Sequence, residues 1–169
     1  MQGRCFLASS YDPNLFDNIR VNVLDAPLDP SRMKIHASSV YGPGNEAEKV
    51  LDGNPATIWH SGQSPAGAFN QSLVIDLGGN VEIDMVSYLP RQDSQTGLIT
   101  AYNLYASQDG VTFTKIASGS WKKDNALKVA TFTAVKAAFI KLEATEAGGG
   151  NMAAAASIHI YAHRTDGAK

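Results

Sequence analysis

The stretch AYNLYASQDGVTFTKIA, residues 101–117, decides the fold class. Tyr102 and Leu104 alternate with the residues between them, which is the period-two pattern of a strand with one buried face. Asp109-Gly110 follows and favours a tight hairpin, because type I′ turns require positive φ at both central positions. The stretch therefore predicts two antiparallel strands joined by a short turn.

Further short strand-like runs recur along the chain between turn signals. In residues 81–89 the apolar positions are Val81, Ile83 and Met85, and the alternation slips before it reaches Tyr88 or Leu89. Repeated runs of this length predict an antiparallel all-β sandwich. Besides those above, the runs are SLVIDLGG (72–79), VEIDMVSYL (81–89), LKVATFT (127–133), AFIKLEA (138–144) and ASIHIYA (156–162).

The sequence predicts only one helix, in NEAEKVLD at residues 45–52. It would make about two turns and end at Gly53 and Pro55, since both residues interrupt helices. The stretch GGGNMAAAAS before the last run reads as a loop, because glycine-rich segments favour irregular backbone.

The chain divides into three expected parts. Residues 1–32 contain a short strand candidate, IRVNVL at 19–24, and then DAPLDPSR, where two prolines break regular structure. This part is expected to be a lead-in and linker from a preceding domain. Residues 33–163 form the sandwich and residues 164–169 a tail.

Composition narrows the classes of function. The chain has 169 residues, 44% hydrophobic and 18% charged, with a net charge of −2, which is typical of a soluble globular domain. The basic pair Lys122-Lys123 is followed by Asp124 and reads as a solvated turn, so nucleic acid is not an expected partner. Cys5 is the single cysteine, so neither an intrachain disulfide nor a thiolate zinc site is possible. No apolar run approaches a membrane span.

The stretch EKVLDGNPATIWHS, residues 48–61, concentrates polar side chains in a turn. Asp52, Asn54 and Thr57 carry the oxygen donors that calcium prefers, and the glycine and proline between them bend the chain so that alternate residues can converge. The alternative is that Asp52 only caps a turn through its own backbone, as Asp-Gly segments commonly do. The residues leave both interpretations open.

Six segments, in this order, resemble the discoidin or coagulation factor 5/8 type C family. The bacterial branch, which includes family 32 carbohydrate-binding modules, is the most similar, and the likeness covers about residues 33–161. It implies an eight-stranded β-sandwich of jelly-roll, galactose-binding-like type with ligand loops at one end. The segments are NEAEKVLDGNPATIWHS (45–61), LVIDLG (73–78), VSYLPRQD (86–93), ITAYNLYASQDGVTF (99–113), FIKLEA (139–144) and ASIHIY (156–161).

The resemblance implies a structural calcium ion in the 49–57 loop. Its ligands would be the Lys49 carbonyl, the Asp52 side chain, the Asn54 carbonyl, and the carbonyl and hydroxyl of Thr57. The last strand often adds a backbone carbonyl and a glutamate, and here those positions are Ala156 and Ser157. A serine hydroxyl brings no charge, so it is a poorer calcium ligand than a carboxylate.

The resemblance also implies a sugar site. Trp59 is expected to be a core anchor, and strand alternation then turns His60 outward toward the loop end. His60 and Arg91 would bond sugar hydroxyls, since they offer complementary donors and acceptors. The alternatives are that Arg91 pairs with Asp93 and that His60 bonds a loop carbonyl.

Several other residues are candidates for that site. Thr96 stands where the family often has asparagine, and Gln63 and Gln92 are polar neighbours. The loop before the last strand lacks an aromatic platform, so Met152 or Phe69 would cover the sugar face; Phe69 otherwise covers a sandwich edge. His36, His159 and His163 lack ligand-like company and are expected at the surface.

The favoured function is therefore a non-catalytic carbohydrate-binding module that recognises galactose-type sugars. It would be appended to a larger exported or surface glycan-processing protein. The alternative is a protein-interaction or domain-packing sandwich that has lost the sugar site. An enzyme is not expected, because the sequence shows no nucleophile triad, carboxylate pair or phosphate loop. Membrane binding, as in the clotting-factor relatives, has weak support from the near-neutral charge.

Overall fold

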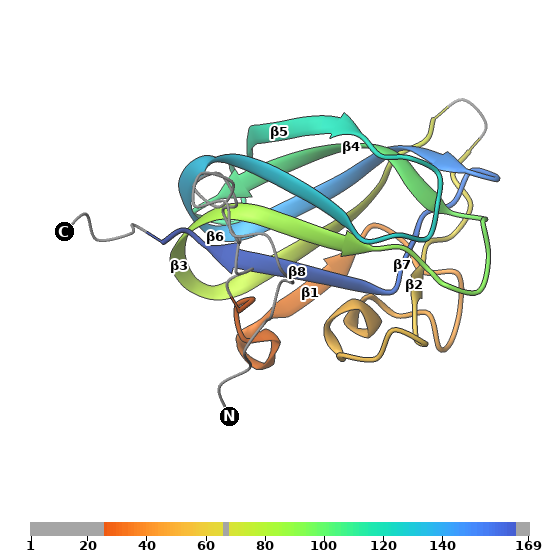
Figure 1. Ribbon diagram of the computed structural model, residues 1–169, viewed down its shortest axis with the longest axis horizontal. Coiled ribbons are helices and arrows are strands. Elements are labelled where there is room, and N and C mark those ends of the chain that lie inside the picture. Colours follow the sequence, from red (N-terminus) through yellow and green to blue (C-terminus); the bar gives the residue numbers. More distant parts are fainter. Residues whose placement is uncertain (1–25, 66–67, 165–169) are drawn as a thin grey trace, which may run out of the picture.

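The computed structural model describes residues 26–65 and 68–164, and these form a curled β-sandwich (Figure 1). Eight strands and two short 3₁₀ helices lie in the described part of the chain, which confirms the all-β prediction. In order they are η1 (Pro30–Arg32), β1 (Lys34–Ala37), η2 (Ala47–Leu51), β2 (Trp59–His60), β3 (Gln71–Leu89), β4 (Leu98–Ser107), β5 (Thr114–Ser120), β6 (Lys128–Gly148), β7 (Ala154–Ala155) and β8 (Ser157–Ala162). The strand candidate at residues 19–24 and Cys5 lie outside the described residues.

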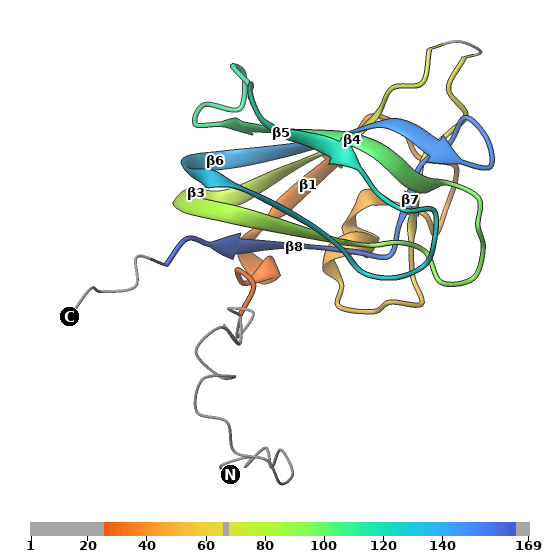
Figure 2. The same cartoon turned by 45° about the horizontal axis from the view of Figure 1, so that its top comes forward.

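One continuous, curled sheet makes both layers. Strand order is β1-β3-β6-β4-β7-β2, with β5 on β4 and β8 on β3, and every pairing is antiparallel except β4 with β7. Figure 2 shows β3 and β6 running the length of the sandwich and passing from one layer to the other. Each of them joins two runs that the sequence predicted as separate strands.

A bend within β3 explains why the two predicted runs form one strand. Pairing with β6 jumps between Asp76 and Val81, so the strand bends there without ending. Gly78 has φ 75°, and a Cβ at this position would lie 2.6 Å from the Arg32 carbonyl oxygen. Only glycine therefore fits both the dihedral angle and the space.

Alternation places the core as expected in most strands. Leu73, Ile75, Leu104, Ile140 and Leu142 are at most 2% exposed, and Trp59 is 1% exposed. The slip in β3 comes earlier than predicted: a bulge lies between Ile83 and Met85. It therefore turns Val86 and Tyr88 inward and leaves Met85 only half-buried.

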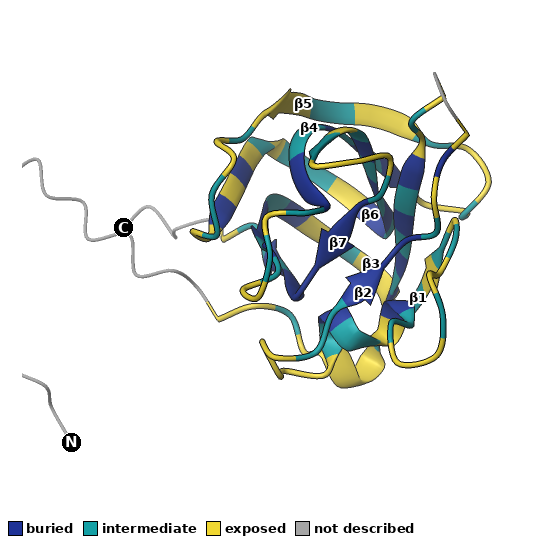
Figure 3. Ribbon diagram, turned by 90° about the vertical axis from the view of Figure 1, so that its right-hand side faces the viewer, coloured by how far each residue is buried: buried dark blue, intermediate teal, exposed yellow. Residues whose placement is uncertain are grey.

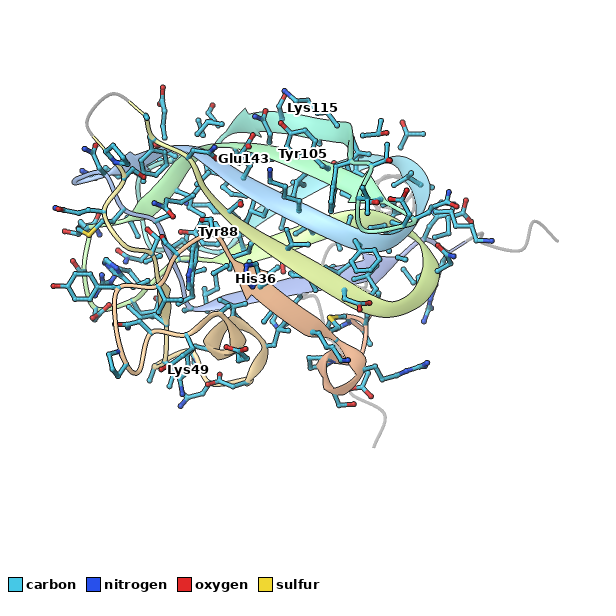
Figure 4. The ribbon with its side chains drawn as sticks, turned by 180° about the vertical axis from the view of Figure 1, so that it is seen from behind. His36, Lys49, Tyr88, Tyr105, Lys115 and Glu143 are labelled. Atoms are coloured by element: carbon cyan, nitrogen blue, oxygen red, sulfur yellow. The ribbon has the colours of Figure 1, made fainter. Side chains whose placement is uncertain are left out.

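The polar face of β4 and β6 carries a cross-strand network (Figure 4). The Tyr105 hydroxyl and the Asn103 amide each donate to Glu143 Oε2 at 2.9 Å. Lys115 and Lys141 lie 5.9 and 5.3 Å from the centre of the Tyr105 ring. These contacts satisfy the side chains that alternation turns away from the core, so the network supports the sheet.

The predictions for the helix and for the hairpin need correction. Residues 45–52 form a 3₁₀ helix over Ala47–Leu51 rather than two α-helical turns, because so short a segment gains little from α-helix nucleation. The hairpin predicted at Asp109-Gly110 exists, but residues 108–113 connect its strands, so the turn is longer than a type I′ pair.

Two of the three histidines that were expected at the surface without partners differ from that expectation. His36 is exposed on β1, as predicted. His159 is half-buried, and burial lowers its pKa. His163 Nδ1 lies 2.8 Å from Asp84 Oδ2, so this histidine is paired with a carboxylate.

The expected linker also packs on the sandwich. The Leu28 amide donates to the Ile160 carbonyl at 2.8 Å, and the Leu28 side chain contacts the core. The boundary at residue 32 stays a prediction.

Candidate functional site

Four loops meet at the end of the sandwich that Figure 3 faces. Backbone hydrogen bonds tie them together: Tyr41 N–H to the His60 carbonyl at 2.8 Å, Ser61 N–H to the Ala153 carbonyl at 2.8 Å, and Gly97 N–H to the Gly148 carbonyl at 2.7 Å. The short β2–β7 pair lies beneath them. Segments that are far apart in sequence therefore form one loop surface, and the predicted sugar-contact residues are distributed over these segments.

His60 is more covered than its predicted outward direction implied. It is 8% exposed, and the Tyr41 ring packs against it edge-on with centroids 5.2 Å apart. Nδ1 lies 2.8 Å from the Ser61 carbonyl oxygen, so the bond to a loop carbonyl that the alternative interpretation predicted is present. A carbonyl only accepts, so Nδ1 carries the proton and Nε2 of the neutral ring is left as an acceptor.

Arg91 is held by Asp93, as the alternative interpretation predicted. Nε donates to Asp93 Oδ1 and Nη2 to Oδ2, both at 2.8 Å, while Nη1 reaches the Thr96 carbonyl only at 3.5 Å. The Arg91 side chain is 13% exposed and that of Asp93 66% exposed. Because the pair is bidentate, the guanidinium plane is fixed, and Nη1 remains the least engaged donor.

The electrostatics of the two residues agree with this geometry. Hydrogen bonds from Arg91 lower the pKa of Asp93. The same bonds raise the pKa of Arg91. The two opposite charges therefore largely cancel within the pair.

The remaining predicted residues have mixed positions. Thr96 is half-buried beside Gly149, and Gln63 is exposed. The Gln92 amide donates to the Pro90 carbonyl at 2.7 Å and the Asn125 carbonyl at 3.0 Å, so its nitrogen supports the loop. Met152 is half-buried in the 148–153 loop. Phe69 packs partly on the core, as its alternative interpretation predicted.

Sequence reasoning missed Tyr41. Its side chain is 68% exposed and lies against His60, where it offers the aromatic surface that the 148–153 loop lacks. The available signal was an aromatic residue beside the Gly-Pro-Gly turn at 42–44, since exposed aromatic residues in loops are common in binding surfaces. Its partnership with His60 is a tertiary contact and was not visible in the sequence.

The predicted calcium loop brings three of its expected residues together. Thr57 Oγ1 lies 2.7 Å from Asp52 Oδ2 and 2.9 Å from the Asn54 carbonyl oxygen. Asp52 Oδ1 also accepts the Asn54 amide at 2.8 Å, which is the turn-capping bond of the alternative interpretation. The donors are one carboxylate, one carbonyl and one hydroxyl, and this hard-oxygen set suits calcium.

The calcium ligands expected from the start of strand β8 are weaker than those of the loop. Ser157 Oγ lies 3.4 Å from the Val50 carbonyl oxygen and is buried, so a neutral hydroxyl stands where a charged ligand was expected. No group of three or more His, Cys, Asp or Glu side chains converges as a metal site within residues 26–65 and 68–164. Among the ligands predicted for this ion, Asp52 supplies the only side-chain carboxylate. The carbonyls of Lys49 and Ala156 stay predicted ligands.

Fold and loop end together define a galactose-binding-like β-sandwich with a polar site at one end. A family model, the F5/8 type C domain, matches residues 34–158. The chain belongs to this family.

Three known proteins or modules are similar to this chain. It is 35% identical over 155 residues to an A type blood N-acetyl-α-D-galactosamine deacetylase of Flavonifractor plautii, covering 88% of this chain and 20% of that protein. It matches CpGH89CBM32-5 from Clostridium perfringens in complex with GalNAc-β-1,3-galactose, with 38% identity and a TM-score of 0.76 over 81% of this chain and all of that one.

It also matches the family 32 carbohydrate-binding module of Clostridium perfringens NanJ in complex with galactose. That match has 31% identity and a TM-score of 0.72, over 79% of this chain and 96% of the module. The chain spans only about a fifth of the length of the curated relatives it matches. Residues 26–65 and 68–164 contain no helix long and apolar enough to cross a membrane.

Proposed function

We propose that this chain is a non-catalytic carbohydrate-binding module for neutral, galactose-type sugars. The observation that carries the proposal is the placement of His60, the Arg91–Asp93 pair and exposed Tyr41 on loops that backbone hydrogen bonds hold together at one end of the sandwich. Two solved relatives with the same fold hold GalNAc-β-1,3-galactose and galactose. The His60 Nε2 acceptor and the Arg91 Nη1 donor offer complementary bonds to neighbouring sugar hydroxyls.

The charge of the site favours a neutral ligand. Asp93 takes two of the Arg91 donors, so the guanidinium is not available as an unpaired cation for a sugar carboxylate. The exposed Asp93 would in addition repel an anionic sugar. Galactose and GalNAc are therefore expected to bind better than sialic or uronic acids.

Tyr41 would supply the stacking surface. Aromatic rings pack against apolar C–H faces of sugars, and this ring is both exposed and braced by His60. A single sugar on this loop surface would bury little area, so we expect a dissociation constant on the order of 0.1–1 mM. Linkage to other domains could then raise the overall affinity through multivalency.

A calcium ion is proposed as a structural element beside this surface. It would be held by Asp52, Asn54 and Thr57, whose oxygens already converge, and it would replace the direct bond between Thr57 and Asp52. Its contribution would be to fix the turn that leads into Trp59 and His60, because these residues follow the loop directly.

The wider setting follows from the relatives. The chain spans about a fifth of the length of two relatives that are named as a deacetylase and a sialidase. We therefore propose that it serves as one module of a larger exported or surface glycan-processing protein. Its contribution would be to hold that protein on galactose-bearing glycans.

Calorimetric or NMR titration with galactose, GalNAc and sialic acid tests the proposal. Arg91→Ala and His60→Ala should each weaken galactose binding, with Arg32→Ala and His36→Ala as matched controls because both of those residues are exposed elsewhere on the sandwich. Sugar binding that survives both site substitutions would place the site elsewhere. If a partner protein is captured through the same loops without sugar, the domain-packing alternative is favoured.

A further inference from the structure

The loop between β5 and β6, residues 121–127, lies against the loop that carries Arg91. Asn125 makes the contact: Nδ2 donates to the Arg91 carbonyl at 2.6 Å and to the Ser94 carbonyl at 3.3 Å. Its Oδ1 accepts a hydrogen bond from the side-chain nitrogen Nε2 of Gln95, and its backbone carbonyl accepts one from Gln92 Nε2 at 3.0 Å. A single residue therefore binds four of the five consecutive residues 91–95.

The Asn125 loop is itself anchored at its start by an aromatic stack. Trp121 packs on Tyr102 with ring centroids 3.8 Å apart and an interplanar angle of 19°, and on buried Tyr88 at 5.1 Å. The Trp121 amide also donates to the Thr100 carbonyl at 2.8 Å. Stacking on two rings restricts both the position and the tilt of the Trp121 ring.

An ion pair anchors the other end of the same loop. Lys128 is 8% exposed, and its ammonium bonds the Asp124 carboxylate, which also accepts the Ala126 amide at 3.0 Å. Because both ends are fixed to the sheet, Asn125 presents its amide from a rigid support. The Arg91 loop has no regular structure of its own over residues 91–97, so it depends on such outside contacts for its shape.

Two contacts thus define where the guanidinium lies. Asn125 fixes the backbone from which the Arg91 side chain leaves, and Asp93 fixes the plane of the guanidinium. The amide of Asn125 is suited to the first task, because it donates to two carbonyls while its oxygen accepts from Gln95.

We propose that Asn125 is a positioning residue that holds Arg91 in its ligand-ready orientation, and this rests on the proposed sugar-binding function. Without the clamp, the loop must be ordered when the sugar binds, and that cost reduces affinity. Asn125 acts on affinity through Arg91, and its effect is expected even though it need not touch the ligand.

The experiment compares Asn125→Ala and Asn125→Asp with the wild type in NMR titrations with galactose. Alanine removes the bonds, while aspartate keeps the shape but turns an oxygen toward two carbonyls. Asn80→Ala and Asn80→Asp are matched controls. Asn80 is exposed at the β3 corner, and at ~3.3 Å per residue it lies about 30 Å along the strand from Leu89.

We expect galactose affinity to fall about fivefold for Asn125→Ala and about tenfold for Asn125→Asp, with both Asn80 variants unchanged. The Arg91 Nε–H signal, recorded without sugar, should shift and exchange faster with solvent in the Asn125 variants only. Global unfolding would instead disturb signals throughout the sheet, so thermal melting is measured in parallel.

Wild-type-like affinity in Asn125→Ala would overturn the proposal, as would weaker binding with an unchanged Arg91 Nε–H signal. If the wild type binds neither galactose nor GalNAc, the proposed function fails, and the sugar-free Arg91 signal alone then decides whether Asn125 positions the side chain. The two failures are therefore distinguishable.

Discussion

Tyr88→Phe should destabilise the sandwich by removing one hydroxyl from its interior. The Tyr88 side chain is fully buried, and its hydroxyl donates to the Ala154 carbonyl at 2.8 Å and accepts the Ile99 amide at 3.1 Å. Burial raises the pKa of this hydroxyl well above its ordinary value, so the proton stays in place. One atom thus links β3 to β4 and β7, beneath the loop end.

The magnitude follows from what the substitution leaves behind. Phenylalanine keeps the ring packing but leaves a buried carbonyl and a buried amide without this partner. Each unsatisfied group costs about 1–3 kcal/mol, so the total loss from the two groups should be about 2–6 kcal/mol. For a domain of this size that corresponds to a melting temperature lower by about 4–24 °C.

Urea unfolding followed by tryptophan fluorescence measures this loss. Tyr161→Phe is the matched control, because the Tyr161 hydroxyl has only a 3.4 Å contact with Ser87 and should cost less than about 1 kcal/mol. An unchanged m-value with a lower midpoint is expected. Equal losses in the two variants, or a loss below about 0.5 kcal/mol for Tyr88→Phe, would refute the assignment of these buried bonds.

Three other predictions concern the loops. In protein that holds calcium at about 100 times its dissociation constant, chelation with EDTA should lower the melting temperature by about 5–10 °C. Asp52→Asn should abolish this difference between the samples with and without EDTA. An unchanged wild-type melting temperature on chelation would contradict the calcium proposal. Tyr41→Ala should weaken galactose binding about fivefold, and Val111→Ala, at an exposed residue at the other end of the sandwich, is the control. If Tyr41→Ala binds galactose as tightly as the wild type, Tyr41 is not part of the site. The amides of Thr112 and Val111 and the Ser107 hydroxyl lower the pKa of Asp109 to about 2, so its stabilising effect should be present above about pH 4 and disappear as the pH falls toward 2. The difference in melting temperature between wild type and Asp109→Asn should therefore shrink over that range, and a constant difference would contradict this.

The sequence predicted the fold because local patterns and tertiary structure agree in most strands. The alternation around Leu104 and Ile140 and the burial of Trp59 required no long-range information. The β3 bulge after Ile83 was less accessible, since its position depends on pairing with both β6 and β8. The joining of two runs into one strand at Gly78 likewise depends on the nearby Arg32 carbonyl.

The candidate site was predictable only in part, for a physical reason. Arg91 and Asp93 are two residues apart, so their pairing was an evident alternative. Tyr41 lies 19 residues before His60 and Asn125 lies 34 residues after Arg91. Contacts at such separations are set by how the loops fold over one another, and no periodicity in a single sequence reports them.

Galactose titration of the wild type beside Arg91→Ala tests the central claim most directly. Arg91→Ala removes charge-assisted hydrogen bonds worth about 1.5–3 kcal/mol, which predicts a loss of affinity of about 10- to 100-fold. Arg32→Ala should bind as the wild type does. If the wild type shows no binding at tens of millimolar galactose or GalNAc, or if Arg91→Ala binds galactose as tightly as the wild type, a sugar site built on Arg91 is contradicted.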